Sequence, residues 1–211
     1  MKKKAFVIAL GLLVLSVSFT SVFAVENKQI TSLVKMINAN KQIKAPDKVL
    51  LKVNGKPISA KDFEKENNLL IYLAESNGSA LPSQNDVINS LAKREALYQK
   101  AAELGLEATD NEAGEFAKQQ RAKFEENNPN ATGKEIIEAE IKASDLTVDQ
   151  YWESTIPEYK KILTLNRLSD YYLKQLGPVD LENPNNAKNI RQVLEQEFDN
   201  ITKKATIEIV K

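Results

Sequence analysis

VLLKVNGKPIS, at residues 49–59, is the stretch that decides the fold. Its first five residues are aliphatic and β-branched, apart from one lysine, and favour a strand. Asn54-Gly55 is a strong turn signal, because both residue types tolerate the backbone angles of a tight turn. We therefore expect a strand at residues 49–53, a turn at residues 54–59, and a helix that begins at Ser59.

A second strand is predicted at the other end of the chain, where residues 205–211 alternate between apolar and polar side chains. Neither strand is stable alone, because an isolated strand leaves its backbone donors and acceptors unpaired. We expect residues 50–53 to pair with residues 206–210. This pairing would close residues 49–211 into one unit around a small two-stranded sheet.

Between the strands the sequence predicts helices at residues 59–77, 83–104, 109–128, 132–141, 147–176 and 187–204. Five of them start with Ser or Thr three residues before Asp, Glu or Gln, which is the pattern of a capping box. Gly105 is the favoured residue for a left-handed stop, with Leu106 placed to pack on the preceding turn. Pro157 should kink the long fifth helix or divide it in two. The predicted fold class is therefore mainly α. The five Ser or Thr residues that open capping boxes are Ser59, Ser83, Thr109, Thr132 and Thr147.

Residues 1–24 have the layout of a secretory signal peptide: MKKK, an apolar run, and VFA before Val25. The alternative is an uncleaved anchor, since residues 5–24 are nearly long enough to span a bilayer. Four hydroxyl residues in the second half of this segment favour cleavage. A bacterial lipid anchor is excluded because the chain has no cysteine.

Residues 25–46 form an N-terminal extension, which we expect to be an amphipathic helix, or a linker if it finds no partner surface. Its apolar residues have helical spacing: Ile30, Leu33, Val34 and Ile37. The main domain is expected at residues 47–211.

The 211-residue chain contains no histidine and no cysteine. These absences exclude Ser-His-Asp and Cys-His nucleophiles, zinc sites of Cys and His, and disulfides. Without the three lysines of residues 1–24, 26 basic and 29 acidic residues remain, a net charge of −3. This mildly acidic balance gives no basic footprint for nucleic acid.

Several motifs, taken in order, resemble the SurA/PrsA family of extracytoplasmic chaperones. They are VNGKPIS at 53–59 with KDF at 61–63, LAKREALYQKAA at 91–102 with ELGL at 103–106, TDNE at 109–112, and LTVDQYW at 146–152. The resemblance covers most of residues 49–211. It implies a multi-helix domain of the SurA N-terminal or trigger-factor C-terminal type, which holds unfolded clients without ATP.

One departure from the family matters for activity. Its members usually carry a parvulin prolyl-isomerase domain of roughly a hundred residues before the closing helix, within the ordinary domain size range. Here residues 177–186 leave room only for a linker, and the histidines of the parvulin site are missing. The resemblance therefore implies a chaperone without isomerase activity, and hence no enzyme.

Aromatic side chains are the candidates for client contact, because burial of apolar area is non-directional and tolerates many sequences. Each is also a candidate for the core. Tyr171 and Tyr172 are the strongest pair, since adjacent helical residues cannot share a face and one should lean outward. The full set of candidates is Tyr171, Tyr172, Tyr72, Trp152 and Tyr151, with Phe116 and Tyr159 as further aromatics.

Other chemistries have little support. Acidic groups such as Glu125-Glu126 and Asp110, Glu112 and Glu115 are read as solvated helix faces and first-turn acids rather than a metal site. No cofactor motif is present. A hydrolase is disfavoured because the commonest general base is missing, although Ser-Lys or two-carboxylate chemistry stays open.

The predicted function is that of an exported bacterial holdase, secreted or in the cell-wall or periplasmic space. Its expected partners are unfolded or nascent exported polypeptides. A homodimer is possible, and a membrane is contacted only through an uncleaved signal. The alternative is a structural or assembly protein of the cell surface or spore that uses the same helical domain to oligomerise.

Overall fold

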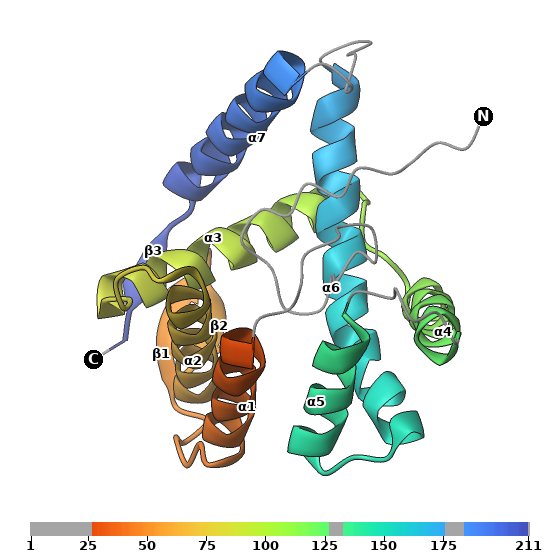
Figure 1. The fold of residues 1–211 in the computed structure, drawn as a ribbon. Coiled ribbons are helices and arrows are strands. Elements are labelled where there is room, and N and C mark those ends of the chain that lie inside the picture. Colours follow the sequence, from red (N-terminus) through yellow and green to blue (C-terminus); the bar gives the residue numbers. More distant parts are fainter. Residues whose placement is uncertain (1–26, 127–132, 176–183, 211) are drawn as a thin grey trace, which may run out of the picture.

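A computed structural model describes residues 27–126, 133–175 and 184–210, with seven helices and three strands in those ranges (Figure 1). The predicted mainly helical class is confirmed. In chain order the elements are α1 (Asn27–Lys41), β1 (Val49–Val53), β2 (Lys56–Ser59), α2 (Ala60–Asn77), α3 (Gln84–Glu103), α4 (Asp110–Glu125), α5 (Lys134–Ser144), α6 (Val148–Gln175), α7 (Pro184–Lys204) and β3 (Ile207–Ile209). The predicted signal peptide at 1–24 and most of the predicted linker at 177–186 lie outside the described residues.

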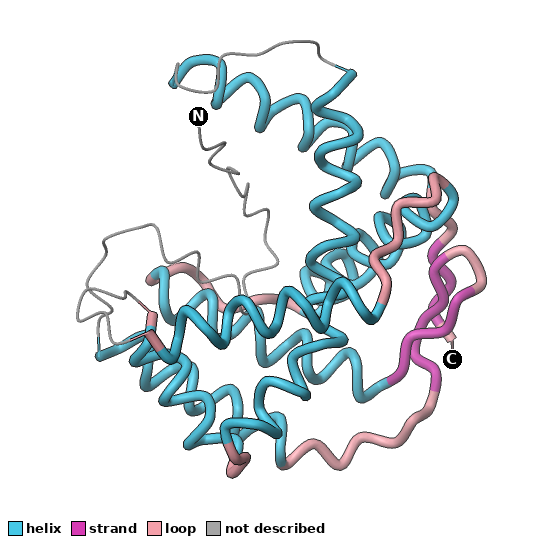
Figure 2. The backbone as a smooth tube through the Cα atoms, turned by 90° about the vertical axis from the view of Figure 1, so that its right-hand side faces the viewer, coloured by secondary structure: helices cyan, strands magenta, loops and turns pink. Residues whose placement is uncertain are grey.

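The predicted pairing of the first and last strands is confirmed. β1 and β3 are antiparallel, with Leu51 opposite Ile209 and Val53 opposite Ile207. Two further hydrogen bonds extend the ladder at its ends: Asn54 N–H donates to the Thr206 carbonyl and Val210 N–H donates to the Leu50 carbonyl, both at 2.8 Å. Figure 2 shows this sheet at one side of the helices, beside the end of the chain.

The prediction of a two-stranded sheet is wrong, because the sheet has three strands in the order β2-β1-β3. Asn54 and Gly55 both have positive φ, at 50° and 83°. These angles make a two-residue turn whose twist matches a hairpin, so the residues after it pair back onto β1. Lys56 lies opposite Val53 and Ile58 opposite Leu51. Residues 56–59 are therefore a strand and not a continuation of the turn.

Helix starts follow the predicted caps. Ser59, Ser83 and Thr109 each accept a hydrogen bond from the backbone three residues later, and the acidic partner accepts one in return. Thr147 and Gln150 make the same reciprocal pair. The exception is α5, whose N-cap is Gly133 with no side-chain cap bond; the predicted cap Thr132 lies outside the described residues.

The core has three apolar clusters that α3 and α6 connect. Under the sheet, Leu51, Val53 and Ile58 pack with Val87 and Leu91 of α3. A second cluster joins α4, α5 and the first half of α6. The third packs the end of α3 and the second half of α6 against Phe198 of α7.

The helix expected in the N-terminal extension is present as α1, and it has a partner surface. Leu33 and Met36 are buried at 2% and 7% exposure, and α1 packs against α2 and α5. Ser32 Oγ donates to Glu75 of α2 at 2.9 Å. Within the described ranges, no helix combines the length and apolar character needed to cross a bilayer.

Pro157 lies inside α6 without dividing it, so the possibility of two separate helices is wrong. Figure 1 shows the first turns of α6 at an angle to the rest of the helix. Proline has no N–H to donate and its ring crowds the carbonyl four residues earlier, which is the usual cause of such a bend. Pro157 therefore sets the direction of the first turns of α6 relative to the rest of the helix.

The pairing of β1 with β3 gives a stability prediction. The N–H of Glu208 points toward Lys52 of β1, whereas the N–H of Ile209 points away from β1, because the two directions alternate along an antiparallel strand. Glu208→Pro should therefore lower the free energy of unfolding by roughly 1–2 kcal/mol more than Ile209→Pro. Urea unfolding measures the difference, and equal losses from the two variants would contradict the register.

Candidate functional site

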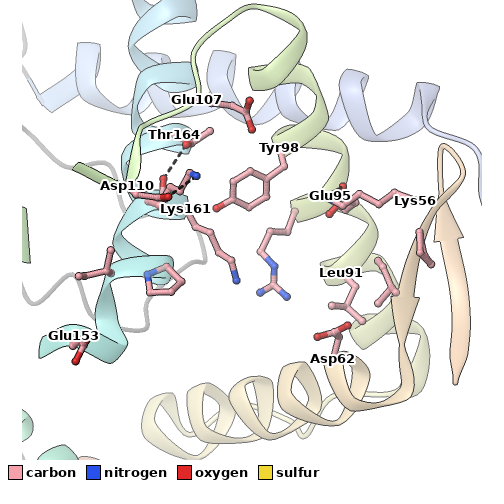
Figure 3. Close-up of a pocket in the computed structure, with 16 residues that line it drawn as sticks. Lys56, Asp62, Leu91, Glu95, Tyr98, Glu107, Asp110, Glu153, Lys161 and Thr164 are labelled. Carbon is pink, nitrogen blue, oxygen red and sulfur yellow. Dashed lines mark hydrogen bonds and ion pairs between the residues drawn. The ribbon is translucent and has the colours of Figure 1, made fainter. Parts of the chain in front are cut away.

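A cavity of about 780 Å³ lies between two walls that are distant in sequence (Figure 3). One wall consists of β2, the first turn of α2, and α3. The other consists of α6 and the loop that leads into α4. Three residues from each wall illustrate the arrangement: Pro57, Leu91 and Tyr98 face Ile156, Pro157 and Thr164.

Tyr98 points into this cavity from α3 (Figure 3). Its hydroxyl is buried and has no hydrogen-bond partner among the described residues. Burial raises the pKa of Tyr98, and the nearby Glu158 carboxylate raises it further. The phenol is therefore neutral at physiological pH, and its buried hydroxyl reaches a ligand only when neighbouring side chains move aside.

Charged side chains make up nine of the sixteen residues that line the cavity, and several of them are paired. Lys56 of β2 lies 3.0 Å from Glu95 of α3, and Lys160 of α6 lies 2.8 Å from Asp110 of α4. Because these charges are neutralised within the walls, the cavity is not built to attract a strongly charged ligand. The charged lining residues are Lys56, Arg94, Lys160 and Lys161 with Asp62, Glu95, Glu107, Asp110 and Glu153.

Arg94 anchors α3 to α2 behind the cavity. Its guanidinium lies 2.6 Å from Glu66, which is only 3% exposed, and Ser90 donates to the same carboxylate. A buried carboxylate needs such partners, because an unpaired buried charge is strongly destabilising. The pairing holds α2 and α3 in one arrangement on this side of the cavity.

The loop between α3 and α4 is held to α6 by specific hydrogen bonds. Ala108 N–H donates to Thr164 Oγ1 at 3.0 Å, and Arg167 donates to the Glu107 carbonyl at 2.9 Å. Arg167 also pairs with Glu112. The hydrogen bond from Arg167, together with those from Thr109, lowers the pKa of Glu112 to about 2. The loop is thus positioned at the cavity rim.

Tyr171 and Tyr172 lie on the second half of α6 and outside the cavity lining. Their ring centroids are 5.3 Å apart in an edge-to-face arrangement. Tyr171 is 37% exposed, whereas Tyr172 is half-buried and packs on Phe198 of α7, with ring centroids 6.4 Å apart. The expectation that one of the two leans outward is therefore met by Tyr171.

Tyr151 and Trp152 do not line the cavity. They are 5% and 4% exposed and belong to the cluster between α4, α5 and α6. Their burial leaves little surface for a client, which corrects their prediction as contact residues. They are buried because the Trp152 ring packs on Phe124 of α4 and the Tyr151 hydroxyl bonds to Glu140 of α5. Phe116 and Tyr159 stack edge-to-face in the same cluster at 5.0 Å, and Tyr72 is half-buried on α2.

The cavity residues were not among the predicted contact residues. Tyr98 follows Leu97 on an apolar helix, and two adjacent helical residues cannot share a face. Leu97 is buried among α3, α6 and α7, whereas Tyr98 is only partly buried against the same cluster and also lines the cavity. The reasoning used for Tyr171 and Tyr172 would have marked Tyr98, but only the fold shows that α6 stands opposite it.

Glu140 is a buried acid outside the cavity, only 5% exposed, and its carboxylate accepts a hydrogen bond from the Tyr151 hydroxyl. Burial raises the pKa of Glu140 to about 7, although the Tyr151 bond opposes the shift. The described residues contain no group of three acidic, His or Cys side chains that could hold a metal ion.

Comparisons of the chain with models of protein families, with curated proteins and with solved structures find no match. The resemblance to the SurA/PrsA chaperones therefore rests on the sequence motifs alone, and the cavity is interpreted from its own geometry.

Glu140 gives a prediction for the pH dependence of stability. Its pKa in the folded protein lies above the unfolded value, so its carboxylate form disfavours folding, and stability should fall as pH rises from about 4.5 to about 7. Glu140→Gln should remove up to roughly 3 kcal/mol of this loss, compared by urea unfolding at about pH 5 and about pH 8.

The matched control is Glu138→Gln, an exposed acid on the same helix, which should leave the pH profile unchanged. Parallel profiles for Glu140→Gln and the unchanged protein would show that the buried carboxyl group does not control stability.

Proposed function

We propose that this chain is an ATP-independent holding chaperone that binds unfolded or extended polypeptides outside the cytoplasm of a bacterium. The observation that carries the proposal is the cavity between β2, α3 and α6, which has apolar side chains on both walls, a phenol with no partner among the described residues, and internally paired charges. The signal-peptide pattern of residues 1–24 supports export. The ordered SurA/PrsA-like motifs support the same assignment.

A cavity of this kind suits a client of variable sequence. Apolar contact is non-directional and accepts any hydrophobic side chain of suitable size. When neighbouring side chains move aside, polypeptide backbone carbonyls and N–H groups supply the hydrogen-bond partner that Tyr98 lacks among the described residues. The paired charges on the rim, such as Lys56 with Glu95, avoid a strong preference for acidic or basic clients. Weak binding of many extended segments is what a holdase requires.

We propose further that the protein has no prolyl-isomerase activity. The histidines of the parvulin site are missing from the whole chain, and residues 177–186 offer no room for such a domain. The commonest general acid–base residue is therefore absent.

The first test is suppression of client aggregation. At near-equimolar ratio the protein should reduce light scattering from reduced insulin. Pro157→Lys should raise the protein-to-client ratio needed for half suppression about fivefold. The lysine places a charge among the apolar lining residues, and an apolar client segment that binds there would have to desolvate it. Pro57→Lys should do the same from the opposite wall without altering α6. Both prolines are exposed.

Two variants serve as controls. Leu81 is 67% exposed and does not line this cavity, so Leu81→Lys should suppress aggregation like the unchanged protein. Tyr171→Ala tests the tyrosine pair instead of the cavity. If Tyr171→Ala loses suppression while Pro157→Lys keeps it, the client site lies at the second half of α6. No suppression by the unchanged protein would refute the proposal.

The second test is catalysis of proline isomerisation. A standard proline-peptide assay should show no acceleration above the uncatalysed rate at any protein concentration. An acceleration that scales with protein concentration would overturn the proposed lack of isomerase activity, while leaving the aggregation result independent.

An assembly protein of the cell surface or spore is the second candidate, favoured by the large aliphatic side chains exposed on the surface. Leu81 and Ile209 are 67% and 64% exposed. Sedimentation distinguishes the candidates, because an assembly protein should form a fixed oligomer and fail to suppress aggregation, whereas a holdase should suppress it.

A further inference from the structure

The outer edge of β3 presents backbone groups that have no partner among residues 27–126, 133–175 and 184–210. β3 is at one end of the sheet, so it pairs with β1 on one side only. The bonds of Thr206 and Val210 to β1 fix the alternation, and they place the N–H and C=O of Ile207 and Ile209 on the side away from β1. These groups are aligned to accept another strand.

The opposite edge of the sheet is protected. In β2, the backbone N–H and C=O groups of Lys56 and Ile58 point toward Val53 and Leu51 of β1. The backbone nitrogen of Pro57 therefore points away from β1, toward the free edge of the sheet. Proline has no N–H, and a proline or lysine on an edge strand is a common device against unwanted pairing. The register also shifts between Val49 and Leu51. β3 carries no proline and no register shift, so the two edges differ in their openness.

An apolar row of the core continues onto β3 and loses its cover there. Ile58, Leu51 and Ile209 are neighbours across the three strands and share one face of the sheet. Their exposures are 6%, 2% and 64%. The helices that bury the first two do not extend over the third. A fourth strand would continue this row and cover Ile209.

The other face of the sheet carries an ion pair between neighbouring strands. Lys52 Nζ lies 3.6 Å from Glu208 Oε1 on the neighbouring strand. A residue opposite Glu208 on an added strand would lie next to this carboxylate, where opposite charges attract and like charges repel. Glu208 is 61% exposed and its pair with Lys52 is a long one, so part of the carboxylate stays open and the position favours Lys or Arg.

A second copy of β3 fits this edge poorly. Antiparallel self-pairing that joins Ile207 of one copy to Ile209 of the other uses both outward-facing residues, but it places Glu208 directly opposite Glu208 of the second copy. Two carboxylates at one cross-strand position are destabilising. In this register, which pairs the two isoleucines with each other, the charge pattern disfavours a second copy and favours a different chain as the occupant.

We propose that β3 binds an extended segment of another polypeptide as a fourth, antiparallel strand. The segment has aliphatic residues beside Ile207 and Ile209 and a basic residue beside Glu208. Backbone hydrogen bonds hold it, and the side chains on the two faces select it. This site is at the opposite edge of the sheet from the cavity, so its test is independent of the cavity variants.

Fluorescence anisotropy of the labelled peptide Ser-Thr-Ile-Lys-Ile-Thr-Ser tests the proposal, with Glu in place of Lys as its matched partner. The unchanged protein should bind the lysine peptide about threefold to fivefold more tightly. Glu208→Lys should reverse this preference. Because the reversal tightens binding of one peptide, partial unfolding cannot produce it.

Ile209→Lys should weaken binding of both peptides, whereas Leu81→Lys, at a similarly exposed leucine, should change neither. Equal affinities for the two peptides, or affinities unaffected by Glu208→Lys and Ile209→Lys, would overturn the proposal. So would loss of binding in Pro157→Lys alone, which would place the peptide in the cavity. A sedimenting dimer that Ile209→Lys dissociates would show that a second copy occupies β3.

Discussion

The antiparallel pairing of β1 with β3 is the constraint on which the rest of the structure depends. It joins segments more than a hundred residues apart and gives each strand the hydrogen bonds that it lacks alone. Asn54 strengthens this junction, because its side chain accepts the Thr206 N–H at 2.8 Å while its own N–H donates to the Thr206 carbonyl. α7 leads directly into β3, so the same junction holds Ile201 and Ala205 against the cluster beneath the sheet.

α3 and α6 connect the sheet to the other helices, because their side chains belong to the apolar clusters of the core. α3 packs under the sheet at its start and against α6 and α7 at its end, and the ion pair between Lys93 and Asp199 at 2.7 Å joins α3 to α7. Pro157 bends α6 opposite α3, and the space between them is the cavity. The sheet therefore contributes twice: β2 forms part of the cavity wall, and β3 offers its edge on the other side. In our two proposals the cavity and the edge both bind extended polypeptide, through side-chain burial in one case and backbone pairing in the other.

The candidate site was predictable only in part. Tyr171 and Tyr172 could be singled out because two adjacent helical residues cannot share a face, and Tyr171 is exposed as expected. Tyr151 and Trp152 satisfy the same local rule, yet both are buried, since α4 and α5 cover α6 from two directions. Which aromatic meets solvent and which meets a neighbouring helix depends on the neighbours. Tyr98 could not be assigned to a cavity before α6 was placed opposite it.

Local sequence determined the elements of this protein and many of their ends. Capping residues such as Ser59 and Ser83 satisfy backbone donors within three residues, and Asn54-Gly55 adopts its turn through its own backbone preferences, so these features need no distant partner. The alternation at residues 205–211 also sufficed to predict a strand and its partner. Tertiary structure decided the cavity and the open edge of β3. Each of these arises where surfaces from separate elements meet or fail to meet: Leu51 and Ile209 share one row, and only the helices packed beneath the sheet bury the first and leave the second exposed.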